Sequence, residues 1–481
     1  MLTIEEYTKH DGLGLAALVE AGEVSAEELL QTALKAIEAL NPTINAVART
    51  IPDGAAAIAA GLPKGPFTGV PFLTKELIPH AKGVTCDFGS RLAAGLVAPN
   101  DSELMARFRR AGFVHCGTTN SPELGYSPTT ENKIRGPVHN PWGLAHSAGG
   151  SSGGGAAAVS SGMVPVAHAS DGGGSIRIPA SCNGLVGLKT SRDRVPSGPD
   201  AGDPLCGLAV EFVVSRSVRD SAAALDAVAG ADPGATGMPV PPDKSFLESS
   251  ATPPRRLRIG WTAQPTSGAT PDPDSVAAVQ GAVTLLQSLG HTVIEEAPQF
   301  DWEAFLGQIH IIWTSSTAFL VDLLSMITGR KPGLDTLEAV TLACYEEGKR
   351  HSAAELIRAI EYGNKISRLY GAFFGTVDIL VTPTMGRPPA LLGDLNQDRA
   401  GLSAMDWTRQ VFSYSPFTPV FNTTGQPAIS LPLYWTASGL PLGVQFATKM
   451  GGEALLLQLA AEIEAAQPWA GRKPPVHAST F

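Results

Sequence analysis

The apolar positions between residues 12 and 40 recur with the spacing of a helix. Ser25 precedes the run AEELLQTALKAIEAL, and Glu28 stands three residues later, which is the pattern of a capping box. The apolar side chains of this run share one stripe at helical period: Leu29, Leu30, Ala33, Leu34, Ile37 and Leu40. We therefore expect a helix that starts after Ser25 and ends at Asn41 and Pro42.

Short apolar runs bounded by glycine and proline alternate with helical stretches along the rest of the chain. The pattern predicts strands at 69–73, 112–120, 163–170, 185–191, 257–261, 291–297, 377–383, 426–433 and 440–448. It predicts helices at 102–111, 154–162, 274–289, 302–327, 336–373 and 452–466. This alternation favours an α/β fold around a largely buried sheet.

A zone rich in proline, glycine and aspartate runs from about 231 to 255. It can be a linker between two domains or a long surface loop, and we favour the loop. We expect a single domain over 1–481. It comprises N-terminal helices within 1–65, a Gly/Ser-rich core at 66–230 and a helical insert near 300–375.

Composition and charge narrow the classes of function. Hydrophobic residues make up 43% and charged residues 17%, which is typical of a globular protein. The net charge of −10 opposes binding to nucleic acid and to anionic membranes. The five cysteines are widely spaced without a C-x-x-C pair, so we expect neither disulfides nor structural zinc. With no secretory signal and no uninterrupted apolar stretch of ~20 residues, we expect a soluble cytoplasmic chain, monomeric or homodimeric.

Candidate chemistry gathers in three segments, of which the clearest is HASDGGGSIRIPAS at 168–181. A strand-like run ends in Ser170 and Asp171, and three glycines then precede Ser175. Consecutive glycines can point successive N–H groups into one space, which would place an oxyanion hole beside the serine hydroxyl. A flexible loop explains the glycines equally well.

The other two segments are SAGGSSGGGAAA at 147–158 and GVPFLTKEL, which contains Lys75. The first lacks the Lys-Ser or Lys-Thr of a phosphate-binding Walker loop. It matches G-x-S-x-G at 149–153, but the residues before it make a poor strand, which a nucleophile elbow requires. Lys75 follows an apolar run, and burial there would lower its pKa toward that of a general base.

Together these segments resemble the amidase signature family. The GGSSGG stretch at 149–154 and the D-x-G-G-S-I-R-x-P turn at 171–179 carry the resemblance, with the two key serines 24 residues apart. TNSPELG at 119–125 and FNTTGQPAISLPL at 421–433 resemble further elements of the family. The resemblance implies a large mixed central β-sheet covered by helices on both faces.

The resemblance also implies a role for each matching residue. Ser175 would be the nucleophile, Lys75 the base, and Ser151 the proton relay that follows a cis peptide bond from Gly150. The oxyanion hole would be formed by the backbone N–H groups of Gly172, Gly173, Gly174 and Ser175. The supporting residues would be Gly150, Ser170, Asp171 and Arg177. The family needs no cofactor and no metal, and this sequence shows no metal-ligand spacing.

Two positions depart from the family pattern. Residue 172 is Gly where the family often has Thr or Ile, and residue 76 is Glu where Asp is common. The first keeps its backbone N–H, and we assign the second no chemical role. His168 lies in a strand-like run, and we interpret it as a packed side chain.

The expected function is hydrolysis of an amide C–N bond in a small, neutral substrate through an acyl-enzyme on Ser175. The sequence around 164–181 resembles the branch that acts on xenobiotic or linear and cyclic aliphatic amides, including nylon oligomers. Esters, anilides and carbamates remain open as substrates. One alternative is the glutaminase subunit of a tRNA-dependent amidotransferase, against which Ile178 argues because Gln is common there. The other is a non-catalytic binding protein on the same scaffold.

We expect the pocket walls to come from 126–132, 302–330 and 412–425. The expected substrate-binding residues are Tyr126, Thr130, Trp313, Phe417 and Asn422. Phe319 and Phe412 are further candidates for an apolar lining, although each aromatic residue can equally belong to the core.

Overall fold

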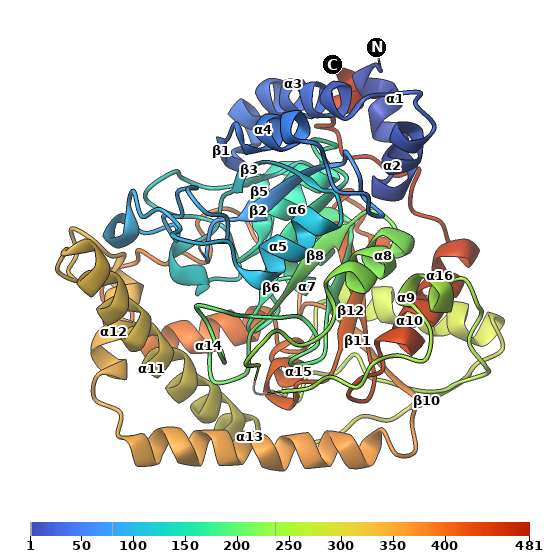
Figure 1. Ribbon diagram of the computed structural model, residues 1–481. Coiled ribbons are helices and arrows are strands. Elements are labelled where there is room, and N and C mark those ends of the chain that lie inside the picture. Colours follow the sequence, from blue (N-terminus) through green and yellow to red (C-terminus); the bar gives the residue numbers. More distant parts are fainter. Residues whose placement is uncertain (1, 79, 236) are drawn as a thin grey trace.

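A mixed β-sheet forms the centre of the molecule in a computed structural model that describes residues 2–78, 80–235 and 237–481 (Figure 1). Within these residues, eleven strands pair in the order β1-β3-β2-β6-β8-β7-β12-β13-β11-β9-β10, and β4 and β5 form a separate pair. The strands are β1 Val47–Thr50, β2 Pro71–Lys75, β3 Val114–Thr119, β4 His139–Asn140, β5 Gly143–Ser147, β6 Val166–Asp171, β7 Val186–Lys189, β8 Val210–Ser215, β9 Arg258–Trp261, β10 Thr292–Glu295, β11 Ile379–Pro383, β12 Ala428–Trp435 and β13 Pro441–Ala447.

The directions of three neighbouring strands bring the candidate site residues at their ends to one edge of the sheet. Strand β2 runs parallel to both β3 and β6, so the carboxyl ends of β2 and β6 meet at the same edge of the sheet. Lys75 ends β2, and Ser170 and Asp171 end β6. On its other side β6 pairs antiparallel with β8, which places Ser170 opposite Glu211.

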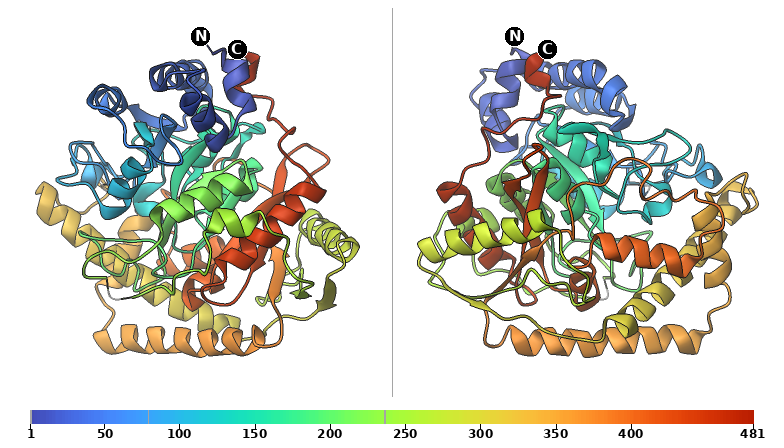
Figure 2. Two further views of the ribbon diagram at one scale, coloured as in Figure 1. Left: turned by 45° about the vertical axis from the view of Figure 1, so that its right-hand side comes forward. Right: turned by 180° about the vertical axis from the view of Figure 1, so that it is seen from behind.

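Helices cover both faces of this sheet, and the two termini lie side by side (Figures 1 and 2). The expected α/β fold with a large mixed sheet is confirmed. The helices are α1 Ile4–Lys9, α2 Gly12–Glu20, α3 Ala26–Ile44, α4 Asp53–Ala60, α5 Glu103–Arg110, α6 Gly153–Ser160, α7 Arg177–Asn183, α8 Val218–Val228, α9 Phe246–Ser250, α10 Pro273–Ser288, α11 Trp302–Thr328, α12 Ala339–Gly348, α13 Ala353–Phe373, α14 Ala404–Tyr414, α15 Pro419–Thr424 and α16 Glu453–Ala466.

Helix α3 begins as predicted and ends later than predicted. Ser25 and Glu28 form the capping box, and the apolar stripe is buried apart from Leu34, which is half-buried. The helix continues through Pro42 to Ile44, because Asn45 adopts the left-handed conformation that ends it, at φ 59°. A proline removes one N–H donor, which the last turn of this helix tolerates.

The predicted helical insert consists of three helices, α11, α12 and α13, which form one side and the base of the molecule in Figure 1. The expected continuous helical stretch at 336–373 is wrong in one respect. It divides after Gly348, and Ser352 starts α13 with a capping box of its own. A strong N-cap within a helical pattern starts a new helix, because its side chain satisfies the free N–H groups of the first turn.

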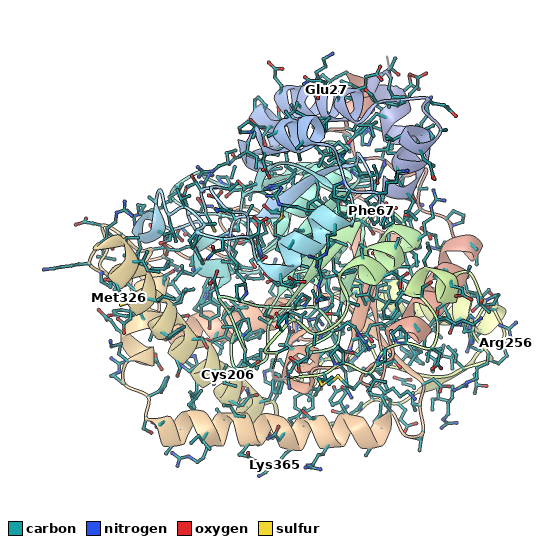
Figure 3. The ribbon with its side chains drawn as sticks, in the orientation of Figure 1. Glu27, Phe67, Cys206, Arg256, Met326 and Lys365 are labelled. Carbon is teal, nitrogen blue, oxygen red and sulfur yellow. The ribbon has the colours of Figure 1, made fainter. Side chains whose placement is uncertain are left out.

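Helix α11 meets the length and composition of a membrane-spanning helix, with a mean hydropathy of 1.5 over its most apolar window. Only 39% of that window is buried within the protein, and an interior helix of a soluble protein passes the same test. Met326, near its end, lies at the outer margin of the molecule (Figure 3). The expectation of no membrane partner stays a prediction.

The zone at 231–255 leads from α8 to β9 and contains the short helix α9. The strands on either side of it, β8 and β9, belong to the same sheet. The chain thus leaves and re-enters one sheet on either side of this zone, and the single-domain organisation stays a prediction.

Candidate active site

Lys75 lies buried at the end of β2, with 1% of its surface exposed. Its Nζ donates to Ser151 Oγ at 2.7 Å and to Ser170 Oγ at 2.9 Å. Burial lowers the pKa of Lys75 to about 7, although the negative charges of Glu211 and Asp171 act in the opposite direction. A pKa lowered this far makes the neutral amine, which can accept a proton, accessible near neutral pH.

Ser151 stands two residues before α6, directly after a cis peptide bond from Gly150. The chain passes very close to its neighbours here, since a Cβ on Gly150 would lie 2.5 Å from the carbonyl oxygen of Thr129. Thr130 holds the same turn, because its hydroxyl donates to Gly149 O at 2.7 Å and accepts from Gly153 N at 3.1 Å.

Asp171 and Arg177 anchor the glycine turn that carries Ser175, and both side chains are fully buried. The Asp171 carboxylate accepts hydrogen bonds from the N–H groups of Gly174 and Ile176 and from the Arg177 guanidinium. Burial alone would raise the pKa of Asp171, but the Arg177 charge and these hydrogen bonds hold it well below its usual range. Asn422 completes the anchor by donating to Asp171 and accepting from Arg177.

The N–H groups of the glycine turn divide into two sets. Gly174 N donates to Asp171 Oδ1 at 2.7 Å, so its predicted place in the oxyanion hole is corrected: this N–H holds the turn. Among the described residues, the N–H groups of Gly172, Gly173 and Ser175 have no protein acceptor. These three donors are available to a substrate oxygen.

Ser175 faces a narrow cavity with a free volume of about 20 Å³, which is room for about one water molecule. The indole of Trp313 stacks on Tyr126 in its wall, with ring centroids 4.5 Å apart and planes 17° apart. The cavity is lined by Gly125, Tyr126, Ser127, Pro128, Gly173, Ser175, Ile178, Trp313, Val411, Phe412 and Ser415. It contains no charged side chain.

Glycine at position 172 makes room for the aromatic wall. A Cβ there would lie 2.6 Å from Leu205 Cδ1 and 3.3 Å from the Trp313 ring. At Gly173 a Cβ would lie 3.2 Å from the ring of Phe412. The departure of residue 172 from the family pattern thus accompanies an indole packed over the turn. Trp313 Nε1 is buried and has no hydrogen-bond partner among the described residues.

Of the three predicted chemical groups, the structure joins two directly. Lys75 and Ser151 are hydrogen-bonded, whereas no hydrogen bond joins Ser151 to Ser175 among the described residues. Hydroxyl contacts of this kind are often longer before substrate binds. The Ser151–Ser175 proton step stays a prediction.

Among the predicted pocket residues, Tyr126, Trp313 and Phe412 line the cavity. Thr130 and Asn422 do not, because their polar atoms bond to the turn at Gly149 and to Asp171. Phe417 is buried outside the lining, and its carbonyl accepts from Gln445. Phe319 was a wrong candidate: it lies on the outer side of α11 with 69% of its surface exposed.

Sequence reasoning missed a polar cluster beside Lys75. His80, His168 and Glu211 are buried there, and the Lys75 backbone N–H donates to His168 Nδ1 at 3.2 Å. The available signal was a single glutamate within the apolar run VEFVVS at 210–215, which was not recognised as a strand.

Comparison with known proteins decides the family. The profile of the family described as Amidase matches residues 28–457, most of the chain. The chain belongs to the amidase family. A 6-aminohexanoate-cyclic-dimer hydrolase of Paenarthrobacter ureafaciens is 36% identical over 480 residues, covering 96% of both chains. An acylamidase of Rhodococcus erythropolis is 32% identical over 474 residues, again covering 96% of both.

Solved structures of related hydrolases share the fold of this amidase. A structure of 6-aminohexanoate cyclic dimer hydrolase matches with a TM-score of 0.93 and 34% identity, covering 98% of this chain and 99% of that one. The same enzyme complexed with substrate matches with a TM-score of 0.92. This amidase is therefore an amide-hydrolysing enzyme built on the amidase signature fold.

Proposed function

We propose that this amidase cleaves the C–N bond of a small, neutral amide through an acyl-enzyme on Ser175. The observation that carries the proposal is the buried Lys75, whose Nζ lies 2.7 Å from Ser151 Oγ. A lysine with a pKa of about 7 is a base suited to neutral pH. Ser175 lies beside three free backbone donors and lines the cavity.

In the proposed reaction, Ser175 attacks the amide carbonyl while its proton passes through Ser151 to neutral Lys75. The N–H groups of Gly172, Gly173 and Ser175 bind the oxyanion that forms. The proton then returns through Ser151 to the amide nitrogen, which leaves as an amine and gives the acyl-enzyme. Water repeats the sequence and releases the acid.

The substrate class follows from the lining of the cavity and from the relatives. An uncharged wall of aromatic and aliphatic side chains favours a neutral acyl group over a charged amino acid. The relatives named as hydrolases of a cyclic aliphatic dimer direct attention to linear and cyclic aliphatic amides. Anilides, esters and carbamates share the same acyl chemistry and belong in the same screen. A cytoplasmic location remains part of the proposal.

A fluorophosphonate probe and the Ser175→Ala variant test the nucleophile. We expect the wild-type enzyme to be labelled on Ser175 and hydrolysis of short aliphatic amides to fall by at least about 10³-fold in Ser175→Ala. Ser181→Ala, in the following helix, is the matched control and should still be labelled. Substantial turnover by a folded Ser175→Ala variant would refute the nucleophile.

A further inference from the structure

A cluster of three polar side chains lies buried beside the catalytic lysine. His168 on β6, Glu211 on β8 and His80 after β2 are each no more than 6% exposed. One ligand-type atom from each lies within 4.8 Å of the others, which is close enough to hold a metal ion. None of the three lines the cavity at Ser175.

The hydrogen bonds of His168 indicate that its Nε2 carries a proton and does not bind a metal ion. Its Nδ1 faces the backbone N–H of Lys75 at 3.2 Å and can only accept there. In a neutral imidazole the proton must then be on Nε2, and a protonated nitrogen cannot ligate a metal. Burial lowers the pKa of His168 well below its ordinary value, which keeps the ring neutral. Glu211 Oε1 lies 3.8 Å from this Nε2, which has no hydrogen-bond partner among the described residues.

His80 holds the same carboxylate from the other side. Its Nε2 lies 3.1 Å from Glu211 Oε1, and its Nδ1 lies 2.9 Å from Ser102 Oγ. Ser102 Oγ accepts from Met105 N, so its own proton is free to donate to His80 Nδ1. His80 Nε2 is then the donor to Glu211. The hydrogen bond from His80 thus orients the Glu211 carboxylate.

The strand register places this carboxylate next to the catalytic amine. Ser170 pairs directly with Glu211 across β6 and β8, and paired residues on adjacent strands share one face of the sheet. Ser170 Oγ is also the second acceptor of Lys75 Nζ, at 2.9 Å. Glu211 therefore pairs with the residue whose hydroxyl accepts from the lysine, and its negative charge acts to raise the pKa of Lys75.

The other charged groups around Lys75 have partners of their own. Asp171 is paired with Arg177, Glu76 with Arg49 and Arg135, and His115 with Asp53. Glu211 forms no ion pair with an arginine or lysine among the described residues. Its charge is the least compensated of the carboxylates near the lysine.

We propose that Glu211 is a positioning residue that supplies the counter-charge for Lys75 whenever the lysine holds the proton taken from Ser175. The inference rests on the proposed function, since it assumes that Lys75 is the base. In the acylation step Ser175 loses its proton and Lys75 becomes an ammonium ion. The carboxylate stabilises that ion, and the hydrogen bond from His80 holds the carboxylate in place.

The test is the pH dependence of kcat/KM in Glu211→Gln, which removes the charge and keeps the shape. Losing a nearby negative charge makes Lys75 a weaker base. The acid limb, which is the rise of kcat/KM with pH below its plateau, should therefore move to lower pH by about one unit. The plateau kcat should fall, while KM should change little because Glu211 does not touch the cavity. Glu211→Asp keeps the charge and should restore most of the wild-type limb.

Two further variants complete the design. Glu453→Gln removes another fully buried carboxylate, one paired with Arg194, and should lower stability without moving the limb. Glu211→Ala is a second uncharged variant in case Glu211→Gln does not fold. A limb that stays in place in either folded uncharged variant, or that moves equally in Glu453→Gln, overturns the inference.

Labelling by fluorophosphonate separates this inference from the proposed function. If wild-type Ser175 is labelled with an acid limb near pH 7 and the limb does not shift in the Glu211 variants, only the role of Glu211 is refuted. If wild-type Ser175 is not labelled, the proposed function itself fails. If instead a chelator abolishes activity and zinc restores it, the cluster binds metal and the counter-charge role is wrong.

Discussion

Lys75 Nζ and Ser151 Oγ are 2.7 Å apart in a part of the core where both side chains are almost completely buried. The contact joins the end of a central strand to a turn of small residues. Water is excluded from the lysine, so its protonation is governed by the surrounding protein groups.

The rate of hydrolysis should therefore depend on pH through Lys75. The neutral amine is the active form, so kcat/KM should rise about tenfold per pH unit below 7 and level off above it, with a midpoint near the Lys75 pKa of about 7. Initial rates between pH 5 and pH 9 measure this. Lys75→Arg should be severely impaired throughout, because a guanidinium does not lose its proton in this range. A flat profile in the wild type would place the base elsewhere.

Replacing the lysine should stabilise the fold while removing activity. The pKa of Lys75 falls from 10.5 in the unfolded chain to about 7, so the unfolded state binds more protons between these values. Lys75→Met should raise the free energy of unfolding by about 1–3 kcal/mol at pH 7, after allowance for the two hydroxyls left without a donor. Its advantage should shrink as pH rises from 7 toward 10. Urea unfolding of both proteins at two pH values decides this, and an advantage that grows with pH would contradict it.

The ion pair between Asp171 and Arg177 should be essential for the catalytic turn. Arg177→Met leaves a buried carboxylate without its partner and should cost about 3–5 kcal/mol of stability, with loss of Ser175 labelling. Arg409→Met is the matched control, because its partner Glu303 is exposed and water screens the pair, so its loss should change stability little. Chemical denaturation followed by circular dichroism compares the two. Equal losses in both variants would argue against the anchoring role.

Trp313 should set the size of the acyl group that reaches Ser175. Trp313→Ala opens the cavity above Gly172 and Gly173, so kcat/KM for a bulky acyl amide should rise relative to that for a short one. Trp302→Ala, at the start of the same helix, removes an indole that packs on Phe300 and Phe305 and should leave the ratio unchanged. Steady-state kinetics on a paired set of amides give the ratio. An unchanged ratio in Trp313→Ala would exclude the indole from specificity.

Local sequence patterns predicted the helices and strands whose formation depends on residues adjacent in the sequence. The capping box at Ser25 lies where expected, and the strands expected at 69–73 and 163–170 form, although β2 is shifted to include Lys75 and β6 begins three residues later. Strand β8 was missed, although it contributes Glu211. Its burial comes from pairing with β6 and β7, and long-range pairing leaves little local signal in a six-residue run.

The sequence by itself determined which residues are candidates for the chemistry, because the motifs that resemble the family, with two serines 24 residues apart and three glycines before Ser175, are local. Only the tertiary structure decided how their atoms are used. It assigned the Gly174 N–H to Asp171 and placed Glu211 opposite Ser170. It showed that Thr130 anchors the turn at Gly149 and that Asn422 anchors the turn that begins at Asp171. The physical reason is that hydrogen bonds and charges act over a few ångströms in space, and residues far apart along the chain meet only when the sheet forms.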